Sequence, residues 1–113
     1  MVSVAPRCLR LGSGMLALSF GRPGLQLWLT NEPRGRTWQK FDLVAHHNQV
    51  SEPEHAIRLS ANGAALSTGY TALCEMGPGR LGIAYDSVPG TFNTTPPTET
   101  FRNRVYIVEI ALV

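Results

Sequence analysis

The sequence predicts an all-β chain made of two consecutive antiparallel units, each with up to four strands. Three observations lead to this fold class. Eleven glycines and eight prolines occur in 113 residues, which indicates many turns and favours short strands over long helices. Apolar residues recur at every second position in several segments, which is the period of a strand with one buried face. The same strand–turn–strand pattern also occurs twice along the chain.

The repeat is visible when residues 9–21 (LRLGSGMLALSFG) are aligned without a gap on residues 74–86 (CEMGPGRLGIAYD). Both copies contain a G-x-G turn, and glycine supplies the positive φ angles of a tight hairpin turn. The strand after the turn has apolar residues on one sheet face. The aligned pairs are Gly12 with Gly77, Gly14 with Gly79, Leu16 with Leu81, Leu18 with Ile83, and Phe20 with Tyr85.

The first unit covers residues 1–45 and contains four expected strands. A strand precedes the first G-x-G turn, and a second strand follows it up to Phe20. A short connection at residues 21–24 leads to a third strand at Leu25–Thr30 (LQLWLT). After a polar turn, residues 37–44 are again strand-like. Short links between successive strands predict an antiparallel order.

The second unit covers residues 68–113 and has three expected strands, at residues 70–75, 81–85 and 104–110. A long polar loop, residues 46–67, separates the units, and only residues 56–59 within it look ordered. A second long loop, residues 89–101, is rich in Thr and Pro. Four-stranded units in tandem are the pattern of propeller blades. The alternative is a single small β-sandwich or barrel.

Strand counting predicts which loops share an end of the sheets, because successive turns of an antiparallel unit alternate between the two ends. The G-x-G turns and the turn at residues 31–36 belong to one end. The connection at 21–24 and both long loops belong to the other. We therefore expect five polar side chains at this second end: Arg22, His46, His47, Tyr70 and Asp86.

Composition limits the classes of partner. The net charge is +2, which is too small to indicate nucleic acid or an acidic membrane surface as a partner. No apolar run approaches the ~20 residues that a membrane span requires. Cys8 and Cys74 lie in apolar strand-like runs, where burial as free thiols is favoured over a disulfide bond. The sequence indicates no compartment.

Three stretches resemble the sialidase (BNR-repeat) family of six-bladed propellers, in its C-terminal part and over nearly the whole chain. Residues 35–38 (GRTW) are similar to the end of the family's Asp-box, S-x-D-x-G-x-T-W, although Asn31 and Pro33 stand at its Ser and Asp positions. Residues 67–73 (STGYTAL) and 79–86 (GRLGIAYD) resemble the family's G-Y-S-x-L and G-x-I-G-x-L-Y-E stretches. Arg22 stands where the family has the last of three substrate-binding arginines. The resemblance implies about two propeller blades, the second incomplete.

The resemblance also implies a chemistry. Family sialidases remove a terminal sialic acid with retention, and they use a tyrosine nucleophile because the substrate carboxylate would repel a carboxylate nucleophile. Tyr70 matches that tyrosine, and Arg22 matches an arginine that grips the substrate carboxylate. Asp86 stands where the family has a glutamate that steadies another arginine, and its shorter side chain reaches less far. A core or rim role for Tyr70 and a solvated turn position for Arg22 are the alternatives.

Most of the catalytic set has no match in this chain. We find no segment that corresponds to the other two arginines, to the acid/base aspartate or to the glutamate that activates the tyrosine. Without that glutamate a tyrosine hydroxyl stays protonated at neutral pH and is a poor nucleophile. We therefore expect a fragment of a sialidase-like glycoside hydrolase that is inactive in isolation. The alternative is a non-catalytic propeller module that binds glycans or a protein partner.

Expectations for cofactors and partners follow from these readings. His46, His47 and His55 raise the alternative of a metal site, but adjacent histidines point to opposite sides of a strand and lack the spacing of a helical pair. We expect no metal and no cofactor, and a sialic-acid-like or other glycan as the substrate. Propeller blades bury their faces against neighbouring blades, so open blade faces predict self-association of the isolated chain.

Overall fold

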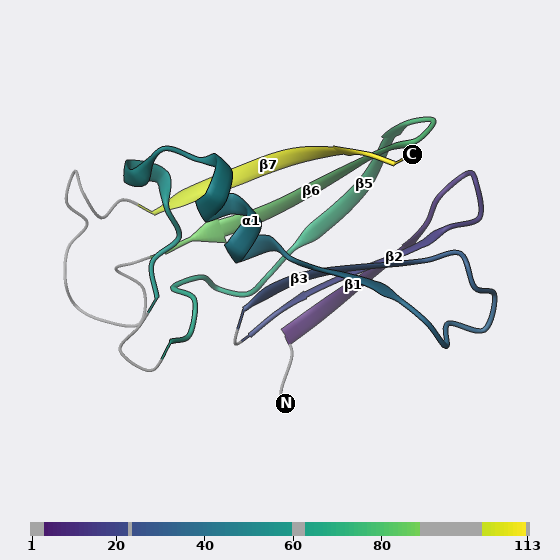
Figure 1. The fold of residues 1–113 in the computed structure, drawn as a ribbon, viewed down its shortest axis with the longest axis horizontal. Helices are drawn as coiled ribbons and strands as arrows, with labels where there is room; N and C mark the ends of the chain where they lie inside the picture. Colours follow the sequence, from purple (N-terminus) through teal and green to yellow (C-terminus); the bar gives the residue numbers. More distant parts are fainter. Residues whose placement is uncertain (1–3, 23, 60–62, 89–102, 113) are drawn as a thin grey trace.

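The computed structural model describes residues 4–22, 24–59, 63–88 and 103–112. Within them the chain forms two antiparallel sheets with one α-helix beside them (Figure 1). The first sheet has the order β1 (Val4–Arg10), β2 (Leu16–Gly21), β3 (Leu25–Thr30) and β4 (Gln39–Asp42). The second sheet has the order β5 (Ala72–Gly77), β6 (Arg80–Ser87) and β7 (Arg104–Ala111). The protein is mostly β, as the sequence predicts. The predicted loop at residues 89–101 lies outside the described residues.

Strand register confirms the internal repeat. Leu9 pairs with Ala17 in the first sheet, and Cys74 pairs with Gly82 in the second, at the positions that the sequence alignment superposes. The third strands follow the same rule, since Ser19 pairs with Leu27 and the equivalent Ala84 pairs with Ile107. The two copies therefore share side-chain orientation as well as turn chemistry, because directly opposed residues lie on the same face of a sheet.

The two sheets pack through faces that are not equivalent in the repeat. Leu81, Ile83 and Tyr85 are buried on the face of the second sheet that looks toward the first. Their equivalents Leu16, Leu18 and Phe20 also share one face, but this face of the first sheet looks away from the second. The inner face of the first sheet consists instead of Ala17, Ser19, Leu25, Leu27 and Leu29, all nearly fully buried. The face of the second sheet that is buried here therefore corresponds, in the repeat, to the outer face of the first sheet. We call this arrangement, in which non-equivalent faces meet, head-to-tail stacking.

Polar contacts tie the β1–β2 hairpin of the first sheet to β5 and the residue before it. The Ser19 and Thr71 hydroxyls are 2.6 Å apart and buried. The Glu75 carboxylate accepts hydrogen bonds from the Gly12 amide at 3.0 and 3.1 Å. β5 accordingly lies against β1 and β2, whereas the far strands of the sheets are separated by the helix. Figure 1 shows this helix in front of the two sheets, between them.

Helix α1 (Leu43–Val50) corrects the prediction for residues 37–44, since only Gln39–Asp42 is a strand and the chain turns into a helix at Leu43. The Asp42 side chain caps the helix by accepting from the Ala45 amide at 3.0 Å. Three residues at helical spacing, Leu43, Val44 and His47, are buried. An eight-residue helix is too short to be stable alone, so this burial between the sheets stabilises it.

The predicted long loop at residues 46–67 is more ordered than expected. Residues 46–50 belong to α1, and a 3-10 helix, η1 (Pro53–His55), follows. The Asn48 side chain accepts from the Ile57 amide at 2.7 Å and donates to the Ile57 carbonyl at 3.0 Å. Ile57 is only 1% exposed. Leu59 and Ala65 form an isolated β-bridge.

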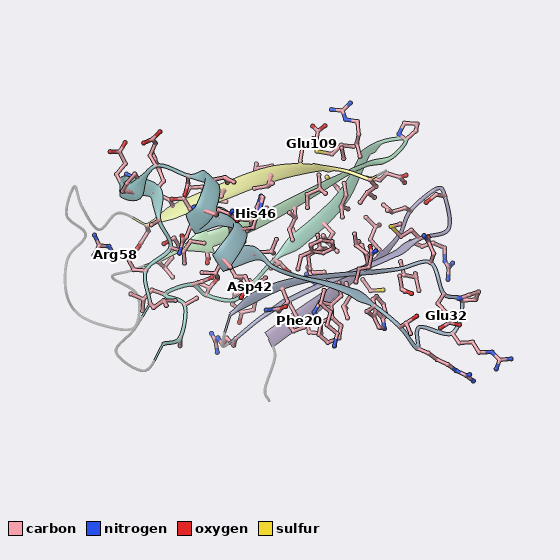
Figure 2. All side chains as sticks on the ribbon, viewed as in Figure 1. Phe20, Glu32, Asp42, His46, Arg58 and Glu109 are labelled. Atoms are coloured by element: carbon pink, nitrogen blue, oxygen red, sulfur yellow. The ribbon has the colours of Figure 1, made fainter. Side chains whose placement is uncertain are left out.

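The turns fall at the two ends that strand counting predicts (Figure 1). At the end with the G-x-G turns, Glu32 closes the turn at residues 31–36. Its carboxylate accepts from the Arg34 amide at 3.0 Å and from the Arg36 amide at 2.6 Å. Figure 2 shows Glu32 at this end of the molecule and Arg58 at the opposite end. No helix of the described residues is both long and apolar enough to cross a membrane.

Candidate functional site

Arg22 occupies a strained position at the end of β2. Its φ angle is 59°, and it is the one non-glycine residue with positive φ in the described part of the chain. Its amide donates to the Gly24 carbonyl at 2.8 Å, and its Nε donates to the Thr68 carbonyl at 3.2 Å. The side chain is exposed. A strained backbone that is held by such contacts is typical of functional sites.

The segment at residues 67–70, which we name the Thr68 loop, is held by Asp86. The Asp86 carboxylate accepts from the Ser67 hydroxyl at 2.7 Å, from the Thr68 amide at 2.9 Å and from the Thr68 hydroxyl. The Ser67 hydroxyl oxygen accepts in turn from the Gly69 amide at 3.0 Å. Charge-assisted bonds of this kind are the strong ones. Asp86, which the resemblance assigns to steadying an arginine, thus positions the Thr68 loop.

Two glycines bring the Thr68 loop against the end of β2. A Cβ placed on Gly21 would lie 2.3 Å from the Gly69 carbonyl oxygen, so only glycine permits this approach. Gly69 has a φ of 80°, which again favours glycine. Tyr70 follows directly, with its amide donating to the Thr68 hydroxyl at 3.3 Å. The structure therefore brings Arg22 and Asp86 into contact with the loop that carries Tyr70.

The Tyr70 side chain is 54% exposed, which argues against the alternative of a core tyrosine. Within the described residues, its hydroxyl has no carboxylate partner. An exposed phenol can stack on and hydrogen-bond to a ligand, and a guanidinium can bind a carboxylate with two parallel bonds.

His46 and His47 lie elsewhere, in α1 and not in the expected loop. His46 is exposed and lines a cavity of about 680 Å³ between the sheets, together with apolar residues such as Leu29 and Val108. His47 is buried, with Nδ1 2.9 Å from the Tyr85 hydroxyl and Nε2 2.7 Å from the His55 carbonyl oxygen. Because a carbonyl only accepts, Nε2 carries the proton and Nδ1 accepts from Tyr85. Neither histidine contacts Arg22 or Tyr70.

His47 and His55 form part of an aromatic cluster that sequence reasoning missed. The His47 ring lies 4.4 Å from the Tyr106 ring, and the Tyr106 hydroxyl donates to the His55 carbonyl at 3.0 Å. Burial, with a smaller contribution from Tyr106, raises the pKa of Tyr85 to about 12. A signal was present in the sequence, because Asp42 followed by Leu43, Val44 and His47 has the pattern of a capped helix with one apolar face. The cluster is structural: it anchors α1 to the second sheet.

The described residues contain no group of three or more His, Cys, Asp or Glu side chains that could hold a metal ion. The comparisons with known proteins add no identification. Neither the models of known protein families, nor the curated proteins, nor the solved structures give a match to this chain.

Proposed function

We propose that this chain is a two-blade section of a sialidase-like propeller, and that the end carrying Arg22 and Tyr70 is part of a site for a sialic-acid-like sugar. Three features support the blade assignment. The two sheets share one strand register, they stack head to tail, and β1 and β5 lie together while α1 separates the outer strands. A sheet pair that is close at one edge and open at the other is the shape of adjacent propeller blades.

The observation that carries the site is the junction between Gly21 and Gly69. It holds Arg22 on the loop that contains Tyr70, so that a guanidinium and an exposed phenol belong to one end of the sheets. In the resemblance these are the third arginine and the nucleophile. A sialic acid has a carboxylate for the guanidinium and a ring and hydroxyls for the phenol.

For this chain alone we propose binding without hydrolysis. Tyrosine needs a carboxylate base to become a nucleophile at neutral pH, and none of the described residues offers one to Tyr70. The alternative function, a non-catalytic module for a glycan or a protein partner, is favoured by Asp86, whose three hydrogen bonds to Ser67 and Thr68 give it a role in the loop. Pro33, at the Asp position of the degenerate Asp-box, points the same way.

Titration with N-acetylneuraminic acid, followed by amide chemical shifts of the full chain, tests the proposal. We expect shifts centred on residues 22 and 67–70 and a dissociation constant of about 1 mM, which corresponds to about 4 kcal/mol. Arg22→Ala should weaken binding roughly tenfold or more, because a hydrogen bond to a charged group contributes about 1.5–3 kcal/mol. Arg34→Ala, which removes an exposed arginine at the opposite end, is the matched control.

The methyl ester of the same sugar separates charge recognition from general sugar binding. It lacks the carboxylate charge, so it should bind as weakly to the wild-type chain as the acid binds to Arg22→Ala. Shifts that spread over the G-x-G end, or equal binding of acid and ester, would refute the site.

A further inference from the structure

The outer face of the second sheet exposes large apolar side chains. Val105 is 74% exposed and Ile107 is 76% exposed, and Met76 on the same face is 45% exposed. Register places Val105 opposite Asp86 and Ile107 opposite Ala84, so these four residues share one face. The same face carries Asp86 and the Arg80–Glu109 ion pair, so charged groups border the exposed apolar side chains. An exposed apolar patch with a polar border usually marks a contact surface.

The internal repeat indicates which surface would pack on this face. Ile107 and Ala84 are equivalent to Leu27 and Ser19 of the first sheet, and Val105 is equivalent to Leu25. Leu25, Leu27 and Ser19 are at most 2% exposed, because α1 and the second sheet together cover this face. The outer face of the second sheet is therefore the same kind of surface as the inner face of the first, without its cover.

The chain also contains a second copy of the surface that packs on the inner face of the first sheet. The inward-facing side chains of β6 are Leu81, Ile83 and Tyr85, of which Tyr85 packs on His47 of α1. Their repeat equivalents are Leu16, Leu18 and Phe20 on the outer face of the first sheet. That face also carries Trp28, whose ring lies 5.1 Å from the Phe20 ring. Figure 2 shows Glu109 at the top, near β7, and Phe20 beside the first sheet. Each chain thus carries two complementary outer faces, one on the first sheet and one on the second.

We propose that a second copy of this chain docks its β1–β3 outer face, with the half-buried Leu16, Leu18 and Trp28, onto the β5–β7 outer face, with Ala84, Val105 and Ile107. Phe20, 8% exposed beneath Trp28, supports this face from within. The contact repeats the head-to-tail stacking already present inside the chain. It is heterologous, so every copy keeps one face for a further copy, and the assembly is a closed ring or an open stack according to the rotation between copies. This inference rests on strand register and burial, and not on the sialic-acid site.

The two cysteines provide a distance probe for this contact. Within the chain, the bonds from Arg7 to Thr71 and from Gly12 to Glu75 place Leu9 across from Leu73 in the sheet stack. The repeat equivalents of Leu9 and Leu73 are Cys74 and Cys8. Both thiols are free and exposed, where the sequence predicted burial. In head-to-tail docking, Cys8 of one copy therefore lies across from Cys74 of the next, whereas both sheets separate the two within one chain.

Cross-linking with diamide tests the proposal, since diamide takes up the two electrons and two protons that a pair of thiols releases on forming a disulfide. A short bismaleimide, which bridges thiols without oxidation, checks the same proximity. Wild-type chain should give dimers and higher species. Cys8→Ser alone and Cys74→Ser alone should give none, while a mixture of the two should give a dimer only.

A dimer from Cys74→Ser alone, through two copies of Cys8, would show like faces in contact and overturn the proposal, as would a dimer from Cys8→Ser alone. A wild-type chain that sediments as a monomer and gives no cross-link would overturn it too. Ile107→Lys should lower the cross-linked fraction about tenfold or more, as expected for loss of a central apolar contact. Val50→Lys, which changes a 68% exposed apolar residue away from both faces, should leave it unchanged.

Discussion

At the scale of single residues, His46 and His47 show how neighbouring positions in a helix place identical side chains in different environments. His46 faces solvent and the cavity beside α1, while His47 is enclosed by Tyr85 and Tyr106. A buried polar side chain is tolerated only with its hydrogen bonds satisfied, and both ring nitrogens of His47 have partners.

His47→Ala should lower the free energy of unfolding by about 2–4 kcal/mol, because it leaves a cavity and an unpaired Tyr85 hydroxyl. His46→Ala removes the neighbouring ring from an exposed site and should change stability by less than about 0.5 kcal/mol. Urea unfolding of the two variants at one protein concentration measures the difference. Equal stability of both variants would contradict the assignment.

Tyr85 makes stability depend on alkaline pH. Its pKa is raised to about 12 in the folded chain, against about 10 for an unfolded tyrosine, because burial disfavours the phenolate. Its contribution is complete below pH ~10 and is lost as the pH rises toward the folded value. Unfolding measured across this range should show a shallower decline for Tyr85→Phe than for the wild type.

At the scale of elements, most strands follow from local pattern, whereas residues 43–44 fit both a strand-like run and a capped helix. Period-two alternation and the G-x-G turns specify β2 and β6 within the sequence itself. In contrast, α1 begins in a segment with strand-like residues, and its burial against β3 and the aromatic cluster overrides that preference. The junction of β2 with the Thr68 loop is likewise a contact between elements, which neither segment specifies alone.

Gly21→Ala tests this junction. The added methyl would lie 2.3 Å from the Gly69 carbonyl oxygen, so the loop must move, at a cost of about 1–3 kcal/mol for overpacking. We expect faster amide exchange at residues 67–70 and a loss of sugar binding similar to that of Arg22→Ala. At Gly24, where the nearest atom is 3.9 Å from such a methyl, substitution by alanine should change neither measurement.

At the scale of the whole molecule, the head-to-tail stack leaves one face uncovered on each side. These faces are the proposed docking surfaces. A site at the ends of the sheets is built from residues of several neighbouring sheets, so two sheets supply only part of it. In the proposed site this chain would contribute Arg22 and Tyr70, and none of its described residues supplies a base for Tyr70.

The isolated chain should therefore release no fluorophore from a fluorogenic sialic-acid substrate. Turnover by the wild-type chain that Tyr70→Phe abolishes would refute this expectation and would assign Tyr70 as the nucleophile. Turnover that persists in Tyr70→Phe would indicate a contaminating enzyme.

Most of the strands, the internal repeat and the end at which each loop lies were determined by the sequence, because each depends on alternation, glycine turns and strand counting along one segment. Tertiary structure decided that Leu81 faces inward while its equivalent Leu16 faces outward, that residues 43–44 enter a helix in place of the predicted strand, and that Asp86 holds the Thr68 loop. These features arise from contacts between segments far apart in the chain, where burial and hydrogen bonding outweigh local preference.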